Sequence, residues 1–240
     1  MKDAYGSNYA TAVKSYAKLG DKSGYNSYSL AATRSNLLKA LDDAAAKDPS
    51  LLIFLYSGHG VSGSICTLDS KTTYDDLFSK FAKFDRIFAM FCCCYPLSGK
   101  QPFKASLHSA NEDKTLGQMF QEYLEKHEYS SANSRAMMKN GILFGDAVQA
   151  DAKEKKALFW SAGKPDEVTW GDDDHVFFMA LRTKFSKSYS YSQQWNEMKK
   201  SDYFAAGFKK KNKDWVLVPN AVHPQVSTAN GFDTSVKVFK

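Results

Sequence analysis

Apolar and polar positions follow one another along the chain in blocks that predict helices and strands in turn. In residues 29–50, leucines and alanines recur at helical spacing until Asp48-Pro49, which predicts a helix with an apolar face made of Leu37, Leu38, Leu41, Ala44 and Ala45. Residues 51–56, LLIFLY, form a continuous apolar run that ends at Ser57-Gly58-His59-Gly60. A run that is apolar on both faces is typical of a buried parallel strand.

The same succession continues further along the chain. Residues 72–84 predict a second helix, because Leu77, Phe78 and Phe81 share one helical face, and residues 86–91, RIFAMF, predict a second buried strand. The later patterns predict a third strand over 155–163, an amphipathic helix over 175–185 and a short strand over 214–219. The order of helix, strand, helix and strand predicts an α/β fold with a parallel sheet and crossover helices.

Length and composition predict a single domain. The chain has 240 residues, of which 43% are hydrophobic, and single α/β domains often reach this size. We find no clear domain linker and predict one domain over residues 1–240. Residues 100–156 are polar and rich in lysine, with a helix expected around 116–124, and they predict a long, basic and loosely packed connection.

Charge and hydropathy restrict the expected partners. The net charge of +6 comes from scattered lysines, and the short cluster Lys209–Lys211 has no accompanying aromatic-basic motif, so we expect no nucleic-acid partner. No apolar run approaches the ~18–20 residues of a membrane span, and the first residues lack the apolar core of a signal peptide. We therefore expect a cytoplasmic protein without a membrane partner.

The four cysteines have an unusual distribution, because Cys92, Cys93 and Cys94 are adjacent and only Cys66 stands apart. Adjacent cysteines cannot join distant segments, which argues against a secreted disulfide framework. Tetrahedral zinc sites use spaced pairs of cysteines, whereas consecutive side chains on a strand point to alternating faces. A reducing compartment is therefore the default expectation.

Two of the predicted strands end in chemically reactive groups. The first ends at Ser57-Gly58-His59-Gly60, and the next ends at the three cysteines. Consecutive parallel strands linked by a crossover helix are commonly neighbours, and their carboxyl ends then lie at one edge of the sheet. A nearby histidine can generate or stabilise the thiolate that attacks, and the flanking glycines leave a backbone N–H free to face a developing oxyanion. Together these residues predict a Cys/His site for acyl transfer.

These motifs resemble a known family. FLYSGHG resembles the histidine strand of the metacaspase and caspase-like cysteine peptidases, and AMFCCCY resembles their cysteine strand, in which Cys94 falls on the nucleophile. Residues 32–41, 157–181 and 223–227 resemble further segments of that family, so that the likeness spans about residues 28–232. The resemblance implies a caspase-like three-layer sandwich, with a mostly parallel central sheet flanked by helices.

The resemblance also implies roles for individual residues. Cys94 would be the nucleophile, His59 the general acid and base, and the backbone N–H groups of Gly60 and Cys94 the oxyanion hole. Ser57 and Cys92 would lie in the substrate pocket, with Cys92 standing where metacaspases have an aspartate that holds a basic P1 side chain. Cleavage after Lys or Arg is the default expectation, and self-cleavage within 100–156 is an associated one. The substrate would be a protein or peptide.

Metacaspases often bind calcium, and Asp69, Asp75 and Asp76 lie in the corresponding region of this chain. The alternative for Asp75 and Asp76 is that they stabilise the N-terminal end of a helix. A second acidic cluster, Asp172–His175, is interpreted as a loop that caps the following helix.

Three functions are therefore compared. The leading hypothesis is a cysteine endopeptidase with a Cys-His dyad. The second is a non-catalytic caspase-like protein that binds or regulates, motivated by Cys92, by Tyr95 in place of the family's histidine, and by the absence of a recognisable first family strand. The third is a redox or metal-binding role for the three cysteines, which leaves His59 without a function.

Overall fold

The computed structural model describes residues 16–17, 30–61, 63–93, 114–138, 155–164, 167, 169, 176–212 and 214–237. In the first part of the chain, the elements up to the end of the second long strand are β1 (Tyr16–Ala17), β2 (Leu30–Ala31), α2 (Arg34–Ala45), β3 (Leu52–Ser57), β4 (Gly60–Val61), β5 (Ser64–Cys66), β6 (Lys71–Thr73), α3 (Tyr74–Phe81) and β7 (Arg86–Cys92). The remaining elements are α4 (Leu116–Met138), β8 (Lys156–Ser161), α6 (Val176–Lys184), α7 (Tyr191–Met198), β9 (Gly207–Lys211), β10 (Asp214–Val218) and β11 (Gln225–Ala229).

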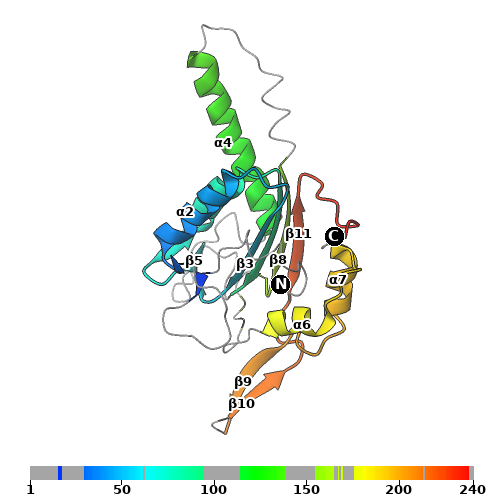
Figure 1. The fold of residues 1–240 in the computed structure, drawn as a ribbon. Helices are drawn as coiled ribbons and strands as arrows, with labels where there is room; N and C mark the ends of the chain where they lie inside the picture. Colours follow the sequence, from blue (N-terminus) through cyan, green and yellow to red (C-terminus); the bar gives the residue numbers. More distant parts are fainter. Residues whose placement is uncertain are drawn as a thin grey trace.

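A four-stranded sheet lies at the centre of the molecule, with the strand order β11-β8-β7-β3 (Figure 1). β3, β7 and β8 are parallel, and β11 pairs with β8 in the antiparallel direction. β3, β7 and β8 match the three apolar runs of the sequence, because a strand covered on both faces needs apolar side chains on both. The predicted fold class, a mostly parallel central sheet flanked by helices, is therefore confirmed.

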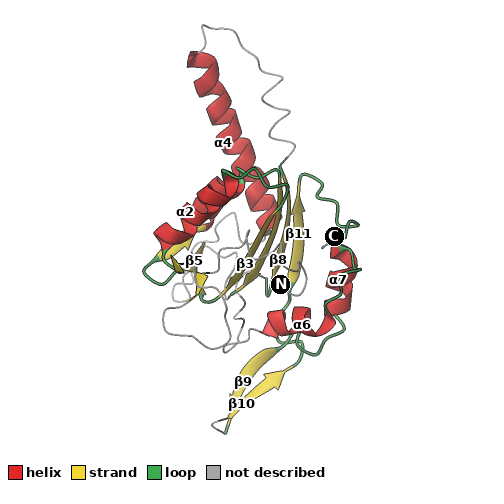
Figure 2. Ribbon diagram, in the orientation of Figure 1, coloured by secondary structure: helices red, strands yellow, loops and turns green. Residues whose placement is uncertain are grey.

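Helices cover both faces of this sheet (Figure 2), and a hydrophobic core lies on each face. α2, α3 and α4 lie on one face, where Leu37, Phe78 and Phe120 pack against the sheet. α6 and α7 lie on the other face, where Phe177 and Trp195 contribute to the second core. Side chains of β7 alternate between the two cores, as the twofold side-chain period of a strand requires.

Two parts of the structure differ from the sequence-based expectation. Residues 100–156 were expected to be a loosely packed connection, but the first turns of α4 bury Leu116, Phe120 and Leu124 in the core. The expected late strand, β10, forms a hairpin with β9 outside the central sheet, and the sheet is completed instead by β11, which the apolar pattern did not reveal. β11 alternates exposed and covered positions and contains only one large apolar residue, Val226, which faces solvent.

The described helices include none that combines the length and the apolar character needed to cross a membrane. The single-domain prediction for residues 1–240 stays a prediction.

Candidate active site at the carboxyl ends of β3 and β7

The two strands that carry the reactive residues are hydrogen-bonded neighbours. The parallel register aligns Leu52 with Ile87 at one end and Ser57 with Cys92 at the other. Beyond the last pair, the Gly58 N–H donates to the Cys92 carbonyl at 3.2 Å. The turn that contains His59 therefore begins directly beside the end of the cysteine strand, as the sequence predicts.

His59 lies in an exposed turn between β3 and β4. Its carbonyl oxygen accepts hydrogen bonds from the Cys66 N–H at 2.8 Å and from the Tyr56 hydroxyl at 2.7 Å. These contacts attach the turn to the small antiparallel sheet formed by β4, β5 and β6, in which Gly60 is paired with Ile65. The His59 side chain is therefore exposed, while the His59 backbone carbonyl is fixed by its hydrogen bonds to Tyr56 and Cys66.

The Tyr56 side chain closely approaches the backbone of Gly58. A Cβ atom added to Gly58 would lie 2.7 Å from the Tyr56 hydroxyl oxygen, which is closer than a real Cβ contact. The first glycine of SGHG therefore lets the tyrosine hydroxyl lie directly beneath the turn.

Cys92 and Cys93 point to opposite faces of the sheet, and neither has exposed surface. Cys92 packs in the core beneath α6 and α7, and its pKa is raised well above the ordinary thiol value by burial and further by the neighbouring Cys93. Cys93 packs in the core beneath α2, α3 and α4, beside Tyr74. Cys94 lies outside the described residues, so its role stays a prediction.

The other residues predicted for the substrate pocket and the oxyanion hole lie at the same edge. Ser57 is exposed at the end of β3, and Gly60 is buried at the start of β4. Cys92 is adjacent to Ser57 in the register, although its thiol faces the interior. The substrate-pocket role of Ser57 and Cys92 and the oxyanion-hole role of Gly60 stay predictions.

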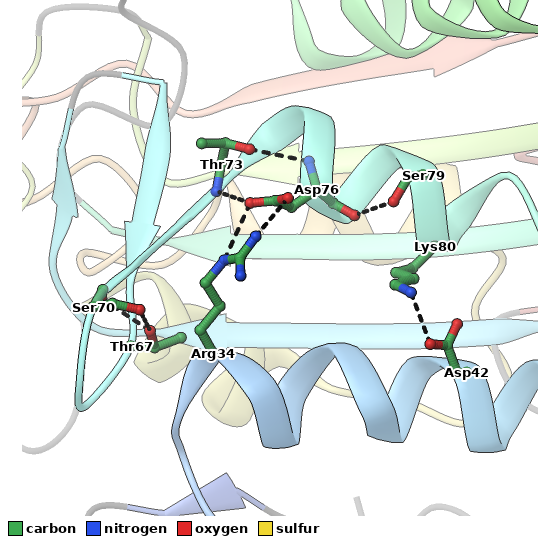
Figure 3. A network of polar contacts seen from close by, with 8 residues as sticks. All are labelled: Arg34, Asp42, Thr67, Ser70, Thr73, Asp76, Ser79 and Lys80. Carbon is green, nitrogen blue, oxygen red and sulfur yellow. Dashed lines mark hydrogen bonds and ion pairs between the residues drawn. The ribbon is translucent and has the colours of Figure 1, made fainter.

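Two of the three aspartates predicted to bind calcium, Asp69 and Asp76, accept hydrogen bonds from Arg34, and Figure 3 shows the contacts of Asp76. Asp76 accepts hydrogen bonds from the Arg34 guanidinium, with Nη2 and Oδ1 2.8 Å apart, and from the Thr73 N–H at 3.1 Å. Asp69 accepts the Arg34 backbone N–H at 2.8 Å, whereas Asp75 is exposed in the first turn of α3. Among the described residues, no group of three or more His, Cys, Asp or Glu side chains is placed to hold a metal ion. This arrangement does not fit a calcium site formed by the three aspartates.

Asp76 instead performs the alternative role considered for it. Its carboxylate and the Thr73 hydroxyl form a reciprocal capping box at the start of α3, which satisfies backbone N–H groups of the first turn. Burial acts to raise the pKa of Asp76, but the hydrogen bonds from Arg34 and Thr73 outweigh it and lower that pKa.

α2 and α3 are also joined at the opposite ends of the two helices, where Lys80 of α3 donates to Asp42 of α2 at 2.7 Å. α2 and α3 are thus joined by ion pairs at both ends.

Sequence reasoning missed a contact between a glutamate and a histidine at the same edge of the sheet. Glu167, in the segment after β8, accepts the backbone N–H of His223 at 2.7 Å, and its second carboxylate oxygen contacts the His223 imidazole. His223 precedes β11, so the pair joins the two segments that flank the β8–β11 pairing. No local signal indicates it, because the two residues are far apart in sequence.

The second acidic cluster, Asp172–His175, lies outside the described residues.

No protein-family model matches this sequence, and no curated protein matches it. Among solved structures, the chain is similar to the protein GSU0716 from Geobacter sulfurreducens, with 15% identity and a TM-score of 0.49 over 86% of this chain and 78% of the other. It is also similar to caspase-1 from Spodoptera frugiperda, with 12% identity and a TM-score of 0.45 over 82% of this chain and 69% of the other. At these scores neither likeness carries an argument about chemistry, and the fold class rests on the observed topology.

Proposed function

We propose that this chain is a cysteine endopeptidase of the caspase-like type, with Cys94 as nucleophile and His59 as general acid and base. The observation that carries the proposal is the register of β3 and β7, which pairs Ser57 with Cys92 and brings the Gly58 N–H to the Cys92 carbonyl. Cys94 follows this strand end by two residues, and His59 follows Ser57 by two residues. A thiol and an imidazole at adjacent strand ends are the groups that peptide hydrolysis by a Cys-His dyad requires.

The proposed reaction has two steps. The Cys94 thiolate attacks the scissile carbonyl carbon, a sulfur–carbon bond forms, and the carbonyl electron pair moves to the oxygen, which the N–H groups of Gly60 and Cys94 would stabilise. His59 protonates the leaving amine as the peptide bond breaks. The proton that His59 donates is the one that it took from the Cys94 thiol. In the second step, neutral His59 accepts a proton from water as the water oxygen bonds to the thioester carbon. The carbon–sulfur bond then breaks, the acid product leaves, and His59 returns the proton to the Cys94 sulfur.

The proposed specificity follows from the substitution at position 92. Cys92 is fully buried and its raised pKa keeps it neutral, so it supplies no negative charge to hold a basic P1 side chain. Lys and Arg are tested first because the family resemblance makes them the default P1 residues, and the neutral Cys92 is the reason that the library also contains the other side chains.

The test is hydrolysis of a fluorogenic peptide library that varies P1, with and without calcium, by the wild type, Cys94→Ala and His59→Ala. We expect hydrolysis by the wild type and loss of more than about a thousandfold in both variants. His127→Ala is the matched control, because His127 stacks on Tyr123 of α4, away from this edge of the sheet. Activity retained in either site variant would refute the assignment of that residue.

A non-catalytic binding function is the second candidate, and the buried Cys92 favours it, since the strand end lacks the aspartate of the metacaspase motif. This candidate predicts no hydrolysis of any library member and no preferential alkylation of Cys94. Rapid, single-site labelling of Cys94 by iodoacetamide would contradict it.

A further inference from the structure

The turn that carries His59 is held by the hydroxyl of a partly buried tyrosine, which the proposed dyad does not use. Tyr56 is the penultimate residue of β3, and its ring packs against the core beneath α2, α3 and α4. Its hydroxyl oxygen lies 2.7 Å from the His59 carbonyl oxygen and 2.8 Å from the Cys66 carbonyl oxygen. One hydroxyl hydrogen is thus shared between two carbonyl acceptors that belong to two different segments.

The third bond of this junction is made by the backbone alone. The Cys66 N–H donates to the same His59 carbonyl at 2.8 Å, next to the paired residues Gly60 and Ile65. The Tyr56 hydroxyl therefore closes the end of the β4–β5 ladder and joins it to β3. Because Gly58 has no Cβ, nothing separates the hydroxyl from the turn.

The position of the His59 imidazole depends on this junction. An exposed side chain is not fixed by packing, so the direction of its Cα–Cβ bond is set by its own backbone. The contacts that the structure shows for His59 are made through its carbonyl, and two of the three bonds at this junction involve the Tyr56 hydroxyl. A rigid ring anchored in the core thereby holds the peptide plane that carries the imidazole.

The same core face also contacts the cysteine strand. Tyr74 is almost fully buried, its ring lies edge-on to Phe91 of β7 with centroids 5.7 Å apart, and Cys93 is buried in the same core. Burial raises the pKa of Tyr74, and the proximity of Cys93 and Tyr56 raises it further. Tyr74 is therefore buried in the same core against which the Tyr56 ring packs.

We propose that Tyr56 is a positioning residue of the candidate site, whose hydroxyl orients His59 by bridging the carbonyls of His59 and Cys66. The inference rests on the proposed function for its catalytic consequence, whereas the anchoring itself can be measured without activity. Tyr56 does not touch the substrate in this proposal. It acts through the backbone of the residue that does.

The variant that tests this proposal is Tyr56→Phe, which keeps the ring and removes only the hydroxyl. The matched control is Tyr191→Phe, because the Tyr191 hydroxyl is buried without a hydrogen-bond partner among the described residues and its ring packs in the opposite core. Thermal unfolding establishes that both variants are folded before any rate is compared.

Two measurements follow. Amide hydrogen exchange of Cys66, whose N–H is bonded to the His59 carbonyl, should become at least about tenfold faster in Tyr56→Phe and stay unchanged in Tyr191→Phe. On the best peptide, kcat of Tyr56→Phe should fall by at least about tenfold with KM within about twofold of the wild type, because misplacement of a catalytic group affects the transition state more than substrate binding.

The outcomes separate the two proposals. Unchanged Cys66 exchange in Tyr56→Phe would overturn the anchoring role, whether or not the protein hydrolyses peptides. Faster exchange with an unchanged kcat would show that the anchor does not position His59 and would overturn the inference, while the endopeptidase proposal stands. If the wild type hydrolyses nothing, the endopeptidase proposal fails and with it the catalytic role of Tyr56, and the exchange result then decides the anchor alone.

Discussion

The consecutive cysteines differ in their surroundings although they are neighbours in sequence. Cys92 belongs to the core beneath α6 and α7, and Cys93 to the core beneath α2, α3 and α4. This follows from the alternation of side chains along β7, which sends adjacent residues to opposite faces. Cys92 and Cys93 are therefore residues of two different cores, although they are adjacent in sequence.

Burial makes Cys92 a poor nucleophile, which predicts its reactivity. Its pKa is raised well above the ordinary thiol value, so the thiolate is scarce at pH 8 and iodoacetamide should leave Cys92 unmodified in the folded protein. Cys66, which is partly exposed, should be alkylated faster. Timed labelling with peptide fragmentation by mass spectrometry measures both sites, and denaturant should equalise them. Modification of Cys92 at the rate of Cys66 in the native state would contradict the buried assignment.

At the scale of elements, α2 and α3 are joined by ion pairs, one of which includes an aspartate predicted to bind calcium. Arg34 contacts Asp76 through its guanidinium (Figure 3) and Asp69 through its backbone N–H. Asp76 also caps α3, so one carboxylate serves both the helix end and the helix pair. The partial exposure of the Arg34 and Asp76 side chains, 42% and 27%, keeps the ion pair modest in energy.

Substitution of this pair should show energetic coupling. Arg34→Gln should reduce the free energy of unfolding by about 0.5–1 kcal/mol, and Asp76→Ala by about 1–2 kcal/mol because it also removes the cap. In the double variant, part of the loss should not add, since the same contact is removed twice. Denaturant unfolding measures all three, with Asp75→Ala as control, because Asp75 is exposed in the same helical turn. Strict additivity would mean that the pair contributes nothing.

At the scale of the whole molecule, α4 is part of the core and closes one face of the sheet. Its first turn rests on β11, where the Gly117 N–H donates to the Ser227 hydroxyl at 3.0 Å. A Cβ atom added to Gly117 would lie 2.5 Å from the Thr228 carbonyl oxygen, which belongs to the backbone and cannot rotate away. The helix and the edge strand therefore meet at a distance that only glycine allows.

Gly117→Ala should consequently destabilise the protein. Alanine would gain up to about 1 kcal/mol from helix propensity, but the overlap with the β11 backbone should cost about 1–3 kcal/mol beyond that gain. The control is Gln121→Ala, an exposed position one turn along α4, which should stay within about 0.5 kcal/mol of the wild type. Thermal and denaturant unfolding measure the difference, and a stabilised Gly117→Ala variant would show that α4 does not pack directly on β11.

The sequence by itself determined the three parallel strands, α2, α3, α6 and the meeting of the SGHG turn with the cysteine strand. These features depend on local periodicity and on long apolar runs, which a buried parallel strand needs on both faces. The sequence predicts that these two strands are neighbours, whereas the register that pairs Ser57 with Cys92 comes from the structure.

Only the tertiary structure decided the rest. β11 has little apolar character because it is an edge strand with one face toward solvent. The core role of α4 arises from contacts with α3, β8 and β11, which are all distant in sequence. The partners of Asp69 and Asp76, the opposite burial of Cys92 and Cys93, and the bridge from Tyr56 to Cys66 each join segments that the chain brings together only when folded. Such contacts produce no periodic pattern in the sequence, because a hydrogen bond or an ion pair needs only one residue from each of the two segments that it joins.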